Sequence, residues 1–345
     1  MRESIATIAI DHAKSVFEIA VSSRAGRVTE RRRLARSRFL EDLAKREPSE
    51  VLLEASSSAH YWARQLRRFG HQVKLLPPHR VRPYRVGNKT DRADAKALLE
   101  AARNEELCPV PVKSVEQQSL MALHRLRSGW VATRTARINT VRGLLREIGL
   151  TIPVGARKVV PRVVELIEDA EAELSAPLRG VLAEVCDEIR ELESRIGLIE
   201  EQLEALGSQT PAVERLQSVP GIGLLAATAL VGFVGEIHRF PSSRHFASYL
   251  GLTPREHSSG STRRLGRISK RGDRYLRTLL VHGARSVLRA ATTAKQPCPL
   301  QLWGRELQQR SGHNKAVVAL ANKISRFAWV VWSEDRAFER LPQAA

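Results

Sequence analysis

Apolar residues between positions 178 and 206 recur at steps that alternate between four and three residues. Such spacing, kept over four heptads, is the repeat of a coiled-coil helix. It predicts a long helix whose apolar stripe packs against a partner, which is either the preceding helix or another protomer. The stripe consists of Leu178, Leu182, Val185, Ile189, Leu192, Ile196, Ile199, Leu203 and Leu206. With an earlier helix expected from Val115 to Ile148, residues 113–210 are predicted to be a long-helix, coiled-coil region.

The first hundred residues show a different pattern, in which strand and helix signals alternate. Helices are expected at Arg38–Arg46, Ala59–Phe69 and Thr90–Asn104, and a polar basic stretch covers Arg80–Lys89. The expected strands are Ser4–Ile10, Val16–Val21, Arg27–Leu34, Val51–Leu53 and Gln72–Leu76. Three strands, helix, strand, helix, strand, helix is the order of an RNase H-like α/β domain, which we place at residues 1–112.

Four acidic residues stand at the ends of these predicted elements. Asp11 follows the first strand, Glu54 follows the short fourth strand, and Asp91 and Asp94 share one side of the last helix. Neighbouring strand ends in such a sheet would bring the four carboxylates together, where they would repel one another. A pair of Mg²⁺ ions relieves that repulsion and can clamp a scissile phosphate.

Each acid also has a purely structural explanation. Asp91 and Asp94 are favoured by the helix dipole at an N-terminus, and Glu54 could cap the helix that begins near Ala59. The joint occurrence of all four at strand ends and on one helix side favours a metal site.

The charge balance points to a polyanionic partner. The chain has 345 residues, with 56 Lys plus Arg against 37 Asp plus Glu, a formal charge of +19. Nucleic acid is the commonest such partner, and a ribosome-bound or generally adhesive basic protein is the alternative. Three scattered cysteines, Cys108, Cys186 and Cys298, predict neither a zinc site nor disulfides. No membrane-spanning or signal-peptide pattern is found, so a cytoplasmic protein, nucleoid-associated when acting, is expected.

From Pro211 onward, residues 211–345 are expected to form a third, mainly helical domain. Two apolar helices there are joined through Gly221 and Gly223 in a segment like a helix-hairpin-helix. The backbone amides of such a glycine turn can bind a DNA phosphate, although helical hairpins are also common as packing devices.

A loop rich in Gly, Ser and Arg is predicted at residues 251–274. Four glycines (Gly251, Gly260, Gly266 and Gly272) would let the backbone approach a ligand, and aromatic residues are nearly absent. The loop is therefore predicted to bind phosphates. Serine becomes a nucleophile where cations stabilise the transition state, and Ser258, Ser259 and Ser261 lie in this loop. The candidate nucleic-acid-binding cations are Arg255, Arg263, Arg264, Arg267, Lys270, Arg271 and Arg274.

Several short motifs together resemble the DEDD transposases of insertion sequences, also called bridge-RNA-guided serine recombinases. The resemblance extends over essentially the whole chain. The motifs occur in the family's order: Ile10-Asp11, Glu54-Ala55, Lys89 through Ala95, Pro220 through Gly223, Gly251 through Arg255, Ser259-Gly260 and Ser269 through Gly272.

This resemblance implies a RuvC-like domain, a coiled-coil middle and a C-terminal transposase domain. It implies that Asp11, Glu54, Asp91 and Asp94 are catalytic metal ligands and that Ser259 is the catalytic serine. Strand exchange would pass through a serine-linked DNA 5′-phosphate with Mg²⁺ assisting. A structured noncoding guide RNA would select the DNA by base pairing, and the protein would act as a dimer or tetramer.

Two other functions remain open from the residues alone. A RuvC-like junction nuclease that uses water would need the four acids but not Ser259. A non-catalytic architectural protein would bind nucleic acid through the glycine turn and the basic loop and would tolerate loss of all four acids.

Overall fold

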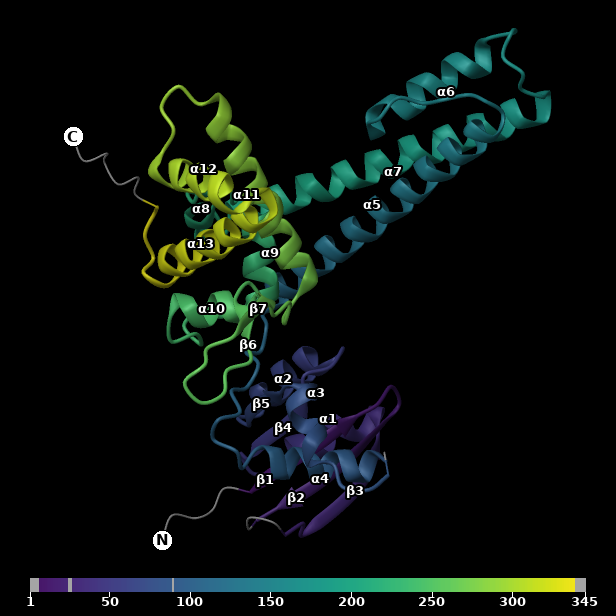
Figure 1. The fold of residues 1–345 in the computed structure, drawn as a ribbon. Helices are drawn as coiled ribbons and strands as arrows, with labels where there is room; N and C mark the ends of the chain where they lie inside the picture. Colours follow the sequence, from purple (N-terminus) through teal and green to yellow (C-terminus); the bar gives the residue numbers. More distant parts are fainter. Residues whose placement is uncertain (1–5, 24–26, 89, 339–345) are drawn as a thin grey trace. The chain divides into compact units, whose positions relative to one another are not determined.

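The computed structural model describes residues 6–23, 27–88 and 90–338. The chain forms two compact units, Met1–Ser114 and Val115–Ala345 (Figure 1). Ser4 and Ile5 of the first predicted strand, and Lys89 of the acidic motif, lie outside the described residues.

The first unit is built on a five-stranded mixed sheet with the order β3-β2-β1-β4-β5. Strands β1–β2 and β2–β3 pair antiparallel, whereas β1–β4 and β4–β5 pair parallel. The strands are β1 (Thr7–His12), β2 (Val16–Ser22), β3 (Glu30–Ala35), β4 (Glu50–Glu54) and β5 (Gln72–Leu76). A mixed α/β unit of this kind is consistent with an RNase H-like domain.

Strand alternation gives the sheet two apolar faces. On one face, residues such as Ile10, Phe17 and Leu53 pack with α1 (Arg36–Ala44) and α2 (Ala59–Arg68). The apolar cluster on the other face is smaller. It packs Ala9, Ala20 and Leu52 against Ala95 and Leu98 of α4 (Asp91–Ala101). The small alanines allow α4 to approach the sheet closely.

Two acids that were predicted to follow strands lie inside them instead. Glu54 is the last residue of β4, where it pairs with Leu76. Asp11 lies inside β1 rather than after it, because the pairing with β2 continues through Asp11↔Glu18 and His12↔Phe17. The basic stretch after β5 contains two short elements that were not predicted, α3 (Pro78–Val81) and the 3-10 helix η1 (Arg82–Tyr84). Proline is tolerated in a first helical turn, and Val81 is buried beneath this segment.

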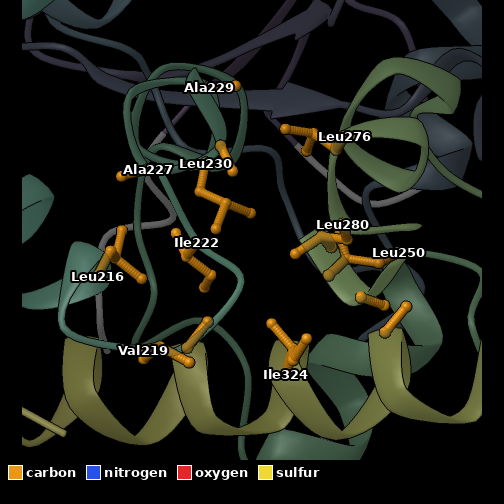
Figure 2. Close-up of a cluster of buried hydrophobic side chains, with 14 of the residues drawn as sticks. Leu216, Val219, Ile222, Ala227, Ala229, Leu230, Leu250, Leu276, Leu280 and Ile324 are labelled. Carbon is orange, nitrogen blue, oxygen red and sulfur yellow. The ribbon is translucent and has the colours of Figure 1, made fainter. Parts of the chain in front are cut away.

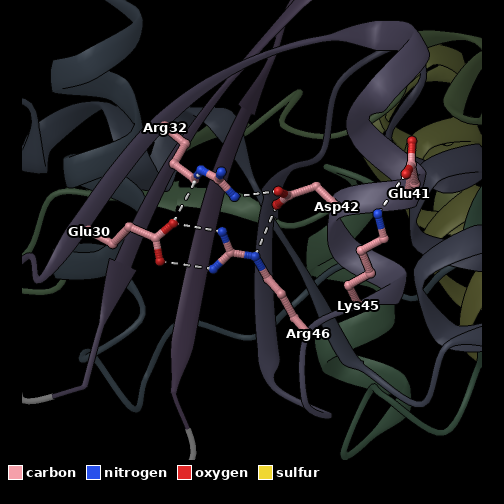
Figure 3. Close-up of polar contacts among 6 residues, drawn as sticks. All are labelled: Glu30, Arg32, Glu41, Asp42, Lys45 and Arg46. Carbon is pink, nitrogen blue, oxygen red and sulfur yellow. Dashed lines mark hydrogen bonds and ion pairs between the residues drawn. The ribbon is translucent and has the colours of Figure 1, made fainter.

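Ion pairs attach α1 to β3, as Figure 3 shows. Arg46 binds both carboxylate oxygens of Glu30, at 2.7 and 3.1 Å, and one oxygen of Asp42 at 3.1 Å. Arg32 also pairs with Asp42. The hydrogen bonds from Arg46 lower the pKa of Glu30. Part of the positive charge of β3 is thus paired within the fold, so the number of Lys and Arg residues overstates the cations available to a ligand.

A pair of long helices, α5 (Val115–Glu147) and α7 (Ala176–Ser208), begins the second unit. They pack against each other, with η2 (Ala156–Lys158) and α6 (Val159–Glu168) between them in the chain (Figure 1). The predicted stripe is buried at Leu182, Ile189, Leu192, Ile196, Ile199 and Leu203. The partner of that stripe includes the preceding helix, which the sequence had left open. Arg127–Glu200, Arg134–Glu193 and Arg137–Glu188 ion pairs join the two helices.

The remaining helices enclose one large apolar core. Figure 2 shows part of it, with Leu216, Ile222, Leu230, Leu280 and Ile324 directed toward one another. No helix in the described ranges is both long and apolar enough to span a bilayer. The helices around the core are α8 (Pro211–Gln217), α9 (Leu224–Val234), α10 (Ser243–Tyr249), α11 (Arg274–Thr293), α12 (Pro299–Ser311) and α13 (His313–Ser333).

Candidate active site

The predicted acids on the strands of the first unit, Asp11 and Glu54, lie on the sheet face that α4 covers. Asp11 is two residues beyond Ala9, and Glu54 is two residues beyond Leu52, so both share the face of those buried residues. Glu18 pairs directly with Asp11 across β1 and β2. The strand period therefore places three carboxylates on the α4 face of the sheet.

Helix α4 contributes the other two predicted acids from its first turn. Its N-cap is Thr90, whose side-chain oxygen accepts a hydrogen bond from the Ala93 amide at 3.2 Å. Asp91 is exposed and Asp94 half-buried. Arg85 donates to Asp94 Oδ1 at 3.0 Å. Asp91 and Asp94 precede Ala95 and Leu98, the residues through which α4 packs on the sheet.

These carboxylates influence one another electrostatically. Burial, together with repulsion from Asp91, Asp94, Glu54 and Glu18, raises the pKa of Asp11 to about 6. The structure thus brings the four predicted acids into one electrostatic group. It adds Glu18, which sequence reasoning missed although its position on β2, opposite Asp11, was predictable from the hairpin.

Carboxylates that repel one another are the donor set a hard divalent cation prefers. The side chains do not converge on one point, however. Among residues 6–23, 27–88 and 90–338, no three His, Cys, Asp or Glu side chains are arranged to hold a metal ion. Asp94 is engaged by Arg85 instead. The carboxylates are chemically suited to a metal ion. A metal ion bound by all four predicted acids would need Asp94 to release Arg85.

The predicted serine loop of the second unit is in part a β-hairpin, which sequence reasoning missed. Strands β6 (Pro254–Glu256) and β7 (Leu265–Ile268) pair antiparallel. The chain reverses at the tip, where the Ser259 amide donates to Thr262 O at 3.3 Å and the Thr262 amide to Ser259 O at 3.1 Å. Gly260 takes a φ of +56° inside this turn. The Ser/Gly/Arg composition concealed the strands because neither has an apolar face: all three residues of β6 are exposed.

The three candidate serines differ in their surroundings. Ser258 donates to Glu256 Oε1 at 2.7 Å and accepts from the Arg264 amide at 3.2 Å, so its hydroxyl is part of the hairpin's bonding. Arg263 also donates to Glu256 Oε1, at 3.2 Å. These hydrogen bonds lower the pKa of Glu256. Ser259 and Ser261 are exposed in the turn beyond this network.

Two glycines of this segment do not serve ligand approach, contrary to the prediction. A Cβ on Gly251 would lie 2.1 Å from Arg271 O, and one on Gly272 would lie 2.0 Å from Tyr249 O. Both glycines have positive φ. Because these glycines have no side chain, the two backbone segments at the base of the hairpin can come into contact. At Gly260 and Gly266, in contrast, there is room for a Cβ.

Most predicted cations of the hairpin remain available to a ligand. Arg263 pairs with Glu256, and Arg255 donates to Ser269 O at 3.3 Å. The others are exposed and form no ion pair with a carboxylate in the described part of the chain; they are Arg264, Arg267, Lys270, Arg271 and Arg274.

The glycine turn between α8 and α9 has one packed and one open glycine. Gly221 has φ +91°, and a Cβ there would lie 2.9 Å from Val287 Cγ2 and 3.0 Å from Gly283 O. Gly223 caps α9 in an extended conformation with no atom within 4 Å of such a Cβ. A packing role therefore explains Gly221, and Gly223 is the one free to approach a phosphate.

Two transposase families match different stretches of the chain. Residues 8–150 match a family described as "Transposase" of the DEDD IS110 type, and residues 213–298 match "Transposase IS116/IS110/IS902 family". A probable family 20 transposase of Pseudomonas aeruginosa is 42% identical over 97% of this chain and 99% of its own length. The transposase for insertion sequence element IS1111A of Coxiella burnetii is 37% identical, over 97% and 92%. That for element IS1328 of Yersinia enterocolitica is 34% identical, over 98% and 99%.

Proposed function

Because this chain belongs to the IS116/IS110/IS902 family of transposases, we propose that it exchanges the DNA strands of an insertion sequence through a covalent bond at Ser259. As a DNA transposase it binds DNA. The observation that supports the serine assignment is the contrast at the hairpin tip. Ser258 is held by Glu256 and the Arg264 amide, whereas Ser259 and Ser261 lie in the turn beyond this network. Of these two, Ser259 directly precedes Gly260 and matches the catalytic serine in the family resemblance.

The proposed step is a transesterification. The Ser259 oxygen attacks a backbone phosphorus, the bond from phosphorus to the 3′ oxygen breaks, and a serine-linked 5′-phosphate forms. The serine proton passes to a general base, and the leaving 3′ oxygen takes up a proton. Attack by the 3′ hydroxyl of another strand reverses the step and frees the serine. One phosphodiester is exchanged for another, so strands can be rejoined without an external energy source. The exposed arginines of the hairpin would stabilise the negative charge of the transition state.

We further propose that Asp11, Glu54, Asp91 and Asp94 hold Mg²⁺, with two ions per site. The family match suggests dependence on a divalent metal, and the raised pKa of Asp11 supports a cation-seeking group. When bound, Mg²⁺ would polarise the attacking and leaving oxygens of the phosphate. The protein itself would place the carboxylates at one sheet face. Arg85, which pairs with Asp94, would balance the charge of that carboxylate when no metal ion is bound.

A guide RNA and a dimer or tetramer complete the proposal. The exposed cations are suited to binding phosphates, and RNA pairing would select the sequence. Residues 1–112, 113–210 and 211–345 would act as the metal-binding, assembly and serine-carrying parts. The cationic hairpin and the open Gly223 would bind the nucleic-acid backbone.

The two alternative functions, an architectural protein and a junction nuclease, differ in their support. Transposase relatives at 37–42% identity over nearly the full chain leave a non-catalytic architectural role without support. A junction nuclease that uses water remains the rival for the chemistry.

The two mechanisms differ in what becomes of the 5′ end. The protein is incubated with RNA from the element end, Mg²⁺ and a nicked suicide substrate, and SDS-resistant protein–DNA bands are sought. We expect a band that disappears in Ser259→Ala and Asp11→Ala and persists in Ser261→Ala. Cut DNA that carries a free 5′-phosphate, without any adduct, would establish the water-using nuclease instead.

A further inference from the structure

A groove of about 1270 Å³ lies in the second unit, lined by the β6–β7 hairpin, α12 and α13. This exceeds the roughly 300–1,000 Å³ of pockets that hold small molecules. The lining belongs entirely to one compact unit, so its shape does not depend on the position of the first unit. Its size suits an extended ligand.

The charge of the groove is of one sign. Five cations line it and no carboxylate does: Arg267, Lys270, Lys315, Lys323 and Arg326. Three of them lie on α13, outside the hairpin that the sequence singled out. In the described part of the chain none of the five forms an ion pair with Asp or Glu. An anionic ligand with several charges would meet uncompensated cations along its length.

Between the cations the groove is apolar. Leu252, Ile268, Val318 and Ala319 contribute to its lining. Trp303 adds an aromatic ring, and Lys323 Nζ lies 4.2 Å from the centre of that ring. A duplex presents mainly phosphates and sugars outward, so an apolar lining gains less from it than from exposed base faces. An unpaired strand presents phosphates and exposed base faces together.

The groove is held in shape by contacts between its walls. Asn322 of α13 donates to Leu252 O at 3.2 Å at the base of the hairpin. The Lys270 backbone has φ +53°, rare for a residue with a Cβ, and its amide donates to Gly251 O at 3.1 Å. A non-glycine residue in this conformation is maintained only where its surroundings fix it. Lys270 is therefore positioned at the groove before any ligand arrives.

We propose that this groove binds an unpaired strand of nucleic acid, with phosphates on the α13 and β7 cations and bases on the apolar lining. The proposal rests on the proposed function only in taking nucleic acid as the partner; it needs neither the serine chemistry nor the metal. The groove shares Arg267 and Lys270 with the hairpin that carries Ser259. A strand held here would be continuous with the DNA or RNA handled at that hairpin.

Binding is tested with the full-length protein in EDTA, so that no cleavage intervenes. Fluorescence anisotropy compares an oligo-dT strand, an oligo-rU strand of equal length and a duplex of that length over a range of salt. Lys315→Gln/Arg326→Gln removes two groove charges at exposed positions. Ala319→Phe fills the apolar lining without changing charge. Arg157→Gln/Lys158→Gln, at exposed positions in η2, is the charge-matched control.

For a single strand, we expect Lys315→Gln/Arg326→Gln to weaken binding roughly tenfold and to reduce the slope of log K against log salt by about 1.4, since each phosphate contact contributes about 0.7. Ala319→Phe should weaken single-strand binding with no change in slope. A loss confined to oligo-dT assigns the groove to DNA, and one confined to oligo-rU assigns it to RNA. Losses no larger than the control's, or an equal loss on the duplex, would overturn the proposal. If binding follows these expectations but no covalent adduct forms, only the serine mechanism fails.

Discussion

His124 joins three helices of the second unit at a fully buried position. Its Nε2 lies 3.0 Å from Thr228 Oγ1 in α9, and its Nδ1 lies 3.0 Å from Tyr275 Oη in α11. The Thr228 hydroxyl donates to Leu224 O at 2.7 Å, so it accepts from Nε2–H, which leaves Nδ1 to accept from Tyr275. This arrangement is satisfied by a neutral imidazole. Burial, with Arg127 nearby, lowers the pKa of His124 to about 4.

His124 should therefore make stability depend on pH. Below pH 6.5 the unfolded chain takes up a proton that the folded protein accepts only near pH 4, so this stabilisation is present above pH 6.5 and is lost as pH falls to about 4. His124→Gln should lower the free energy of unfolding by about 1–3 kcal/mol at pH 7.5, and the difference from wild type should shrink toward pH 4. Thermal melts across this range measure both effects. His313→Gln, at an exposed position, is the control; a difference between wild type and His124→Gln that stays constant with pH would contradict the assignment.

The serines show what residue-level patterns leave undecided. Ser258, Ser259 and Ser261 are the same residue type within four positions, so composition could not separate them. The distinction depends on Glu256 and Arg264 meeting Ser258 across the hairpin, and that pairing was not predicted. The four acids were predictable because strand and helix periods place them, whereas the bond from Arg85 to Asp94 depends on the short helices before α4.

At the scale of elements, α7 tests whether the heptad stripe stabilises the second unit. Leu203 is fully buried, whereas Leu198 on the same helix is 57% exposed. Leu203→Ala should cost about 2–5 kcal/mol of unfolding free energy through lost burial and a cavity. Leu198→Ala should change it by less than about 0.5 kcal/mol. Chemical denaturation of the two variants measures the contrast; equal losses would mean that the stripe is not the packed side of α7.

The α8–α9 turn allows packing and binding to be separated. Gly221→Ala meets Gly283 O and Val287 at about 3 Å and has the unfavourable φ, so we expect a loss of about 2–4 kcal/mol. Gly223→Ala meets no neighbour and should leave stability within about 0.5 kcal/mol. Thermal denaturation gives the stabilities, and salt-dependent DNA binding of Gly223→Ala then reports on phosphate contact alone. A Gly221→Ala protein as stable as wild type would refute the packing role.

Most elements with an apolar face were predictable, and the exposed hairpin of β6 and β7 was not. β5 was predicted to the residue, and α5 and α7 nearly so, because buried side chains recur at the strand or helix period. β1 extends to His12 because its last residues pair with β2. The sequence of one strand alone does not show where such pairing ends. β6 and β7 are short and exposed except at Ile268, which conceals a hairpin made by backbone bonds.

For the molecule as a whole, the candidate groups divide between the two units. The acids belong to residues 1–114, and Ser259, Gly223 and the cationic groove belong to residues 115–345. One transposase family matches residues 8–150, which include the acids and all of α5, and another matches residues 213–298, which include Gly223 and Ser259. The division explains why the sequence could indicate two chemistries independently, a carboxylate group and a cationic serine hairpin, without showing how they meet.

The proposed mechanism depends on a covalent bond between Ser259 and DNA. To detect this bond, the adduct is trapped on a suicide substrate, protein and DNA are digested, and mass spectrometry locates the peptide residue that carries the nucleotide. We predict a phosphodiester at Ser259, formed by wild type and by Ser261→Ala. A nucleotide on Ser258 or Ser261, or cleaved DNA that ends in a free 5′-phosphate with no modified peptide, would contradict it.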